Sequence, residues 1–242
     1  MNTRVYFVVI GLYVATLACA IPFVSQDSAV SGSGDIVTVE GSVTDFDSLD
    51  INHSFNVDII QSQTSSAIVR VDDNIEQYLI FEQRGNTLVL DLEDGREYIN
   101  ITLEAQISIP SLSSLDVSGA SDAKFTQFQS AEPFDLRASG ASTAEGDIEA
   151  GDVTIDLSGS SDIQLAGSGN NLNLNISGSS RADLEEFSVN DANLDIGGSS
   201  DVIVNASGTL NVTASGASDI IYVGSPTLGK IETSGSSSIQ GQ

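Results

Sequence analysis

The side chains with catalytic potential are few. His53 is the only histidine among 242 residues, and it lies in Asn52-His53-Ser54 beside a run of alternating apolar residues. Serine and aspartate are abundant, so a Ser-His-Asp arrangement is formally open, but no Gly-x-Ser-x-Gly nucleophile elbow occurs in a strand-to-helix context. We therefore expect His53 to be solvated or hydrogen-bonded locally. The sequence predicts no catalytic, cofactor-binding or metal-binding residues, and hence a protein that is not an enzyme.

A row of aspartates is the second candidate for chemistry. The four acids occupy the same position of a repeated motif, where Thr143, Arg181 and Ser238 interrupt the row, and they are Asp122, Asp162, Asp201 and Asp219. Stacked carboxylates repel, and Ca²⁺ could relieve this repulsion. The Gly-Gly-x-Gly-x-Asp pattern of calcium-binding β-rolls is absent. We interpret the acids as solvated turn residues and keep a calcium-stabilised module as an alternative.

The single cysteine lies at the end of a predicted signal peptide, residues 1–19. Val5–Ala18 is an apolar run of signal-peptide length, too short for a typical membrane span. Ala18-Cys19-Ala20 fits cleavage before Ile21, whereas Thr16-Leu17-Ala18-Cys19 resembles a lipobox in which Cys19 would be lipidated. An uncleaved anchor is the third option, disfavoured by the short run. Residues 20–34, rich in serine and glycine, are predicted to be a flexible linker.

The composition of the chain disfavours some classes of binding partner. The chain has 34 acidic residues against 8 lysines and arginines, a formal net charge of −26. Nucleic acid and anionic membrane surfaces are disfavoured, because phosphate binding needs clustered basic residues. Membrane contact is expected only through an N-terminal lipid anchor. No cysteine follows Cys19, so the exported chain is predicted to fold without disulfides.

A five-residue motif of the Ser-Gly-Ala-Ser-Asp type recurs seven times in the C-terminal half. Its central glycines lie 21, 19, 19, 20, 18 and 19 residues apart, and they are Gly119, Gly140, Gly159, Gly178, Gly198, Gly216 and Gly235. A serine follows two positions later in every copy, at Ser121, Ser142, Ser161, Ser180, Ser200, Ser218 and Ser237. Such regular spacing indicates a repeat architecture.

The motif is flanked by segments in which every second residue is apolar, as in Val153–Leu157. Period-two alternation predicts strands with one buried face. Continued through the motif, the alternation places Gly159 and Ser161 on the inward side. We interpret the motif as a tight corner in which glycine provides a positive φ or a close backbone approach, and in which stacked serines bond to each other or to corner backbone groups.

These features predict an all-β fold, a right-handed single-stranded parallel β-helix with coils of 19–20 residues. Leucine-rich repeats need a Leu-x-x-Leu-x-Leu spacing that is missing, and propeller blades are about 40 residues long. Strand-like runs continue through the N-terminal half, from Ile36 to Ile109, without a linker before the repeats. We predict one domain, 35–242, with irregular N-terminal coils or a cap over 35–112 and seven regular repeats over 113–242.

The order of segments resembles a known bacterial family, the putative auto-transporter adhesin, head GIN domain. The resemblance covers roughly residues 40–240. The matching segments are Phe46–Ile51, Asn56-Val57-Asp58-Ile59, Val69–Asn74, Leu88–Leu92, and Ile109-Pro110-Ser111-Leu112 leading to Val117-Ser118-Gly119-Ala120-Ser121-Asp122. The resemblance implies an exported β-helix, often on a lipoprotein or surface protein. It brings no catalytic residues.

We therefore predict a non-enzymatic β-helix protein of the cell envelope, cell surface or periplasm, an adhesin or binding scaffold whose ligand is a glycan or a protein. A carbohydrate-active β-helix enzyme is the alternative from another class. It requires carboxylates gathered in one groove with His53 or an arginine. A chain whose acids are spread evenly over the coils would not meet this requirement.

Overall fold

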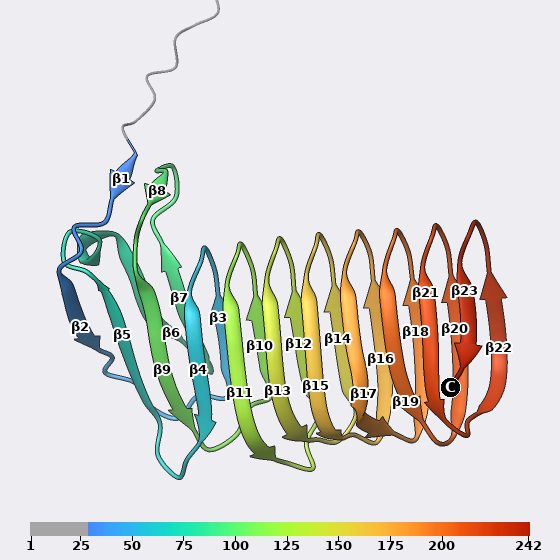
Figure 1. Cartoon of the computed structure of the whole chain (residues 1–242). Coiled ribbons are helices and arrows are strands. Elements are labelled where there is room, and N and C mark those ends of the chain that lie inside the picture. Colours follow the sequence, from blue (N-terminus) through green and yellow to red (C-terminus); the bar gives the residue numbers. More distant parts are fainter. Residues whose placement is uncertain (1–28) are drawn as a thin grey trace, which may run out of the picture.

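The computed structural model describes residues 29–242. The predicted signal peptide, Cys19 and the first part of the predicted linker lie outside the described residues. Two sheets face one another along the length of the molecule, one of ten strands and one of eleven (Figure 1). Each coil runs up one strand of the ten-stranded sheet, turns at a Gly/Ser corner, and runs down one strand of the eleven-stranded sheet.

The seven repeats form seven stacked coils. Their strands in the ten-stranded sheet are β10 (Ser114–Val117), β12 (Phe134–Ala138), β14 (Val153–Leu157), β16 (Asn171–Ile176), β18 (Asp191–Ile196), β20 (Thr209–Ala214) and β22 (Thr227–Thr233). Those in the eleven-stranded sheet are β11 (Asp122–Gln129), β13 (Thr143–Glu149), β15 (Asp162–Ser168), β17 (Arg181–Val189), β19 (Asp201–Ala206), β21 (Asp219–Gly224) and β23 (Ser238–Gly241). Neighbours pair in parallel, which confirms the predicted all-β parallel β-helix.

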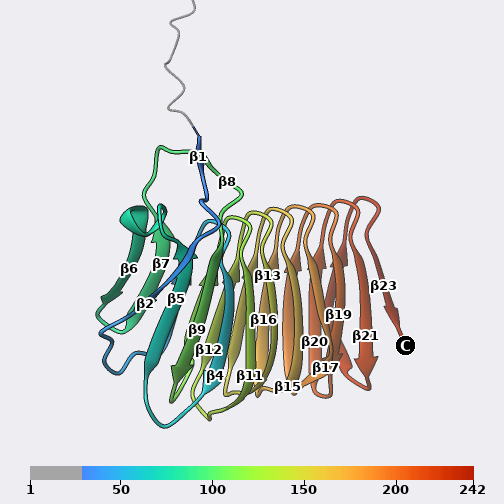
Figure 2. The same ribbon diagram turned by 60° about the vertical axis from the view of Figure 1, so that its left-hand side comes forward.

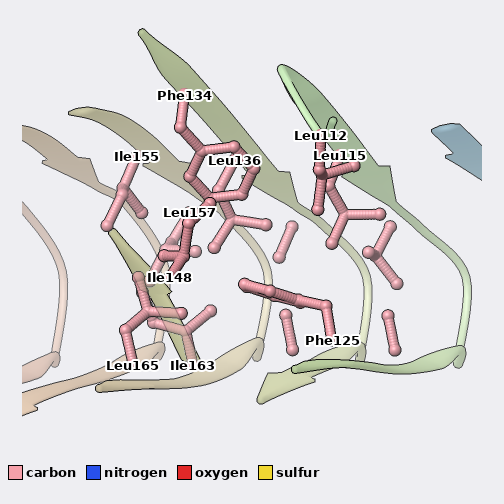
Figure 3. Packing of buried hydrophobic residues seen from close by; sticks show 14 of the residues in the cluster. Leu112, Leu115, Phe125, Phe134, Leu136, Ile148, Ile155, Leu157, Ile163 and Leu165 are labelled. Atoms are coloured by element: carbon pink, nitrogen blue, oxygen red, sulfur yellow. The ribbon is translucent and has the colours of Figure 1, made fainter. Parts of the chain in front are cut away.

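The core lies between the two sheets. Alternate residues of β14 are buried, and β12 shows the same pattern. Figure 3 shows leucine and isoleucine side chains from successive coils meeting in this space, together with the Phe125 and Phe134 rings, whose centroids are 5.7 Å apart. Burial of each large apolar side chain contributes about 1.5–3 kcal/mol. The stack is therefore held by apolar packing inside each coil and by parallel backbone pairing between coils.

The N-terminal half does not stack in chain order. β3 (Ser48–Ile51) and β4 (Asn56–Gln61) form the first coil of the chain and pair in parallel with β10 and β11. The intervening segment then pairs on the other side of that coil, where β7 (Thr87–Leu92) lies parallel to β3 and β9 (Leu103–Ile109) lies parallel to β4. The chain between β4 and β10 thus forms a second coil on one side of the first coil. It then returns to the other side, where the seven repeats continue the stack.

Antiparallel strands close this end of the solenoid (Figure 2). β6 (Leu79–Arg84) forms a hairpin with β7 through Gly85-Asn86, and β5 (Ser66–Asp72) pairs antiparallel with β9. β2 (Ile36–Glu40) lies antiparallel to β5, and η1 (Glu76–Tyr78) is a single 3₁₀ turn. Within residues 29–242 there is no helix of the length and apolarity that a membrane crossing needs.

The end of the predicted linker is ordered, in contrast to the prediction. β1 (Val30–Ser31) pairs in parallel with β8 (Tyr98–Ile99). The Ser33 amide donates a hydrogen bond of 3.0 Å to the Asn74 side chain. Serine and glycine content indicated flexibility, but these residues find their partners in segments 40 to 70 positions away, which local composition does not reveal.

Candidate functional site

Glycine is required at the seven corner positions. All seven have positive φ, and at Gly159 the value is 77°. A Cβ atom at Gly159 would clash with the carbonyl oxygen of Gly140 in the coil before it, so larger residues are excluded by both conformation and space. The glycines lie at the exposed tips of the corners, not on the inward side. The alternation does not continue through the motif because a left-handed residue reverses the chain direction there.

The corner serines lie inside. The Ser121, Ser142, Ser161, Ser180, Ser200 and Ser218 side chains are all buried, while the Ser237 side chain is half-buried. The Ser161 hydroxyl donates to the Ser158 carbonyl at 2.9 Å, and the Ser161 amide donates to the Ser180 hydroxyl at 3.3 Å. A corner hydroxyl can thus donate within its own coil and accept from the coil before it. Their bonds to the corner backbone give these serines a structural role in the corners.

His53 takes the corner-tip position of the first coil. Its φ is 63°, and Gly119 of the next coil stacks directly on its carbonyl group. The imidazole Nδ1 bonds to the Asp91 carboxylate, and the ring packs edge-on against Tyr98 with centroids 6.0 Å apart. Among the described residues no serine hydroxyl bonds to this imidazole. The contacts of His53 therefore tie the first corner to β7, through Asp91, and to β8 (Tyr98–Ile99), through Tyr98.

The aspartates that share a motif position also lie in one row in the structure. Residues Asp122, Thr143, Asp162, Arg181, Asp201, Asp219 and Ser238 are in register across seven strands. The Ser238 hydroxyl donates to Asp219 at 2.7 Å, and the Arg181 guanidinium pairs with Asp183 of its own strand at 3.3 Å. Within residues 29–242 no group of three or more His, Cys, Asp and Glu side chains is arranged to hold a metal ion.

Asp72 is a buried carboxylate that no feature of the sequence singles out. Its side chain is 1% exposed at the end of β5. Oδ2 accepts the Thr102 amide and Oδ1 accepts the Gly34 amide, each at 2.7 Å. The Thr102 hydrogen bond lowers the pKa of Asp72, burial opposes this effect, and the Gly34 bond adds to the lowering. The carboxylate ties the N-terminal segment to the chain before β9.

A shallow groove of about 500 Å³ runs along the ten-stranded sheet beside the corners. Two rows of side chains line it, and each of five successive strands, β10 to β18, contributes to them. The row on the sheet consists of Asp116, Arg137, Asp156, Asn175 and Asp195, which are in register. The row at the corners consists of Ser139, Ser158, Ser177 and Gly197. We call this feature the corner groove.

One hydrogen bond and one ion pair join the middle of the sheet row. The Asn175 amide nitrogen donates to Asp156 at 2.7 Å, and the Arg137 guanidinium lies 3.6 Å from the other oxygen of the same carboxylate. Burial raises the pKa of Asp116, with a further contribution from the neighbouring Asp50 charge. Sequence analysis missed this groove. The available signal was the fixed distance of two residues between each sheet-row residue and the first residue of the following corner motif.

The fold and its corners define an extended, parallel β-helix with exposed polar faces. The chain belongs to the family described as "Putative auto-transporter adhesin, head GIN domain", whose model matches residues 45–226, as the sequence resemblance predicted. A comparison with curated proteins gives no match.

Solved structures share this fold. A putative adhesin from Bacteroides fragilis superposes with a TM-score of 0.81 at 20% identity, covering 88% of this chain and 100% of that one. A putative lipid binding protein from Parabacteroides distasonis gives 0.72 at 19% identity, covering 88% and 99%. A putative adhesin from Parabacteroides merdae gives 0.67 at 17% identity, again covering 88% and 99%. At these identities the likeness concerns the fold.

Proposed function

We propose that this chain is a non-enzymatic, exported β-helix that serves the cell surface as an adhesin or binding scaffold. The observation that carries the proposal is the pair of long sheets whose outward side chains form in-register polar rows over many coils. Such a surface presents the same groups repeatedly to one partner. Weak contacts that repeat along a rigid support add up to firm attachment.

Polar contact fits the described surface better than lipid contact. The Bacteroides fragilis and Parabacteroides merdae proteins are described as putative adhesins, which agrees with this view, whereas the Parabacteroides distasonis protein is described as a putative lipid binding protein. Among residues 29–242, four large apolar side chains are exposed, Ile36, Ile60, Ile99 and Leu228. They lie on four different strands, β2, β4, β8 and β22, and form no shared apolar patch of the kind that marks lipid-binding surfaces.

Export and anchoring are the second part of the proposal. We infer that residues 1–19 direct export and that Cys19 is the candidate lipid attachment point, ahead of the folded domain. Mass spectrometry of the mature N-terminus tests this directly. A lipidated Cys19 supports anchoring, an N-terminus at Ile21 indicates release after cleavage, and an intact Met1 in the exported protein contradicts the signal peptide.

Adhesion itself is tested with particles. Beads coated with the purified chain should bind to cells or to isolated cell-envelope material, and the soluble chain should compete for this binding. Beads coated with the heat-unfolded chain are the control, because they keep the charge and lose the in-register rows. Equal binding by native and unfolded coatings, or no binding to any surface, would contradict an adhesive role.

A further inference from the structure

We propose that the corner groove binds a neutral, extended, β-linked polysaccharide, one sugar ring per coil. This inference rests on the proposed adhesive function and names the ligand class. Each coil offers the groove one planar polar side chain or arginine from the sheet row, and three of the five also offer a serine from the corner row. Carboxylate, amide and hydroxyl groups together can accept from and donate to sugar hydroxyls.

Spacing selects the kind of polymer. Parallel strands are ~4.8 Å apart, so the five strands set groups in register over about 20 Å. The ring-to-ring advance of an extended β-linked pyranose chain is close to this coil spacing. An extended peptide has side chains on one face only every ~6.6 Å and falls out of step with the coils. The groove therefore fits a glycan lying along the solenoid axis, not a peptide strand.

The charge of the groove excludes some classes of glycan. The groove contains three carboxylates, Asp116, Asp156 and Asp195, against one guanidinium, Arg137. The whole chain has a net charge of −26, so sulfated or uronate polymers are repelled. Arg137 has its own partner in Asp156 and is not free to recruit an anion. A polymer of uncharged hydroxyl-bearing sugars gains hydrogen bonds without this repulsion.

Preorganisation supports binding at a surface this shallow. Asp156 receives the Asn175 amide and lies beside Arg137, so these side chains already have defined positions before a ligand arrives. The backbone beneath them is a continuous parallel sheet. The entropy cost of ordering these side chains is therefore largely incurred on folding. Less of the free energy of each weak hydrogen bond is then lost when a ligand binds.

Titration with β-linked glucose and N-acetylglucosamine oligosaccharides of increasing length tests the proposal. Affinity should rise with length up to about five rings, because five strands line the groove, and then level off. Asp156→Ala with Asn175→Ala should weaken binding about tenfold, the expected effect of losing two hydrogen-bonding groups. The matched control is Asp162→Ala with Gln164→Ala on β15 of the other sheet, which removes one carboxylate and one amide away from the groove.

Three outcomes overturn the inference. They are no binding of any neutral oligosaccharide, binding that the groove variant and the control variant reduce equally, and preference for an anionic polymer. The bead experiment separates this failure from failure of adhesion: beads that still attach while oligosaccharides do not bind contradict the corner groove and leave the adhesin in place. Thermal melts of both variants check that each one folds.

Discussion

At the residue scale, the fold depends most on the corner glycines, because each is fixed by two separate constraints. Gly159 has a φ of 77° and lies against the Gly140 carbonyl group. Gly85, in the β6–β7 hairpin, has a φ of 63° but has open space where a Cβ atom would lie. The two positions therefore separate backbone conformation from steric exclusion.

Gly85→Ala should destabilise the protein by about 1 kcal/mol, the cost of a left-handed conformation for an L-residue. Gly159→Ala adds the displacement of a neighbouring coil, and we expect a loss of about 3 kcal/mol. Urea unfolding of both variants measures the difference. Equal losses would mean that neighbouring coils yield freely at the corners, contrary to the close stacking described above.

The same residues show what sequence could and could not reveal. The spacing of the seven glycines, together with the alternation on either side of them, predicted a parallel β-helix, because a repeat places one signal in every coil. His53 stands alone in the sequence, and its place at a corner tip emerged only when β3 was paired with β10 across 66 residues. Asp72 gave no signal, since its amide partners lie 38 and 30 residues away along the chain.

At the element scale, Asp72 joins the N-terminal segment to the chain before β9 through the Gly34 and Thr102 amides. Its folded-state pKa is lowered from 3.8, so the charged form stabilises the fold. That stability is fully present well above pH 3.8 and is lost as the pH falls through the lower, folded-state pKa. Asp72→Asn cannot accept both amides as a carboxylate does, so its melting temperature should fall by a few degrees at neutral pH.

The pH dependence distinguishes this carboxylate from a general effect of substitution. The gap in melting temperature between wild type and Asp72→Asn should be constant above about pH 5 and should shrink in more acidic buffer. Melts recorded across this range measure it. A gap that stays constant down to acid unfolding would show that the Asp72 charge contributes nothing. Asp73→Asn, one residue further along, is the control at an exposed position.

Strands of a solenoid contact mainly their neighbours, so stability should vary along the stack. Three residues of β18 are buried, whereas none is buried in β22 or β23. We expect backbone amides of β16 and β18 to exchange with solvent slowest and those of β22 and β23 fastest. Hydrogen-exchange mass spectrometry resolves these segments. Uniform protection from β10 to β23 would indicate a fully cooperative stack.

The order of strands is the element-scale feature that sequence could not supply. Alternation indicated strand-like runs between Ile36 and Ile109, where β4, β7 and β9 lie, because side-chain parity is a local property. Alternation contains no information on pairing partners, so the segment that pairs behind β3 and β4 was predicted only as irregular coils or a cap. The corner groove was missed for the same reason, since rows across strands exist only once the register is known.

At the scale of the whole molecule, the charge of −26 is spread over long outward rows and opposes compaction. Carboxylates at the Asp201 and Asp219 positions stand directly opposite one another on neighbouring strands. Screening weakens this repulsion, so NaCl should raise the melting temperature, with most of the gain reached once the Debye length falls to about 8 Å near physiological ionic strength.

The effect of Ca²⁺ on the melting temperature distinguishes simple repulsion along the aspartate row from calcium binding. If the aspartate row only repels, Ca²⁺ acts as another screening ion, and millimolar CaCl₂ added on top of saturating NaCl should leave the melting temperature unchanged. The melting temperature of a calcium-stabilised module would instead rise further, because an ion bound only to the folded state adds stability that grows with the ion concentration. Excess chelator would then reverse the rise. We expect no rise and no reversal, since Asp219 already accepts the Ser238 hydroxyl and the row is broken at Thr143 and Arg181.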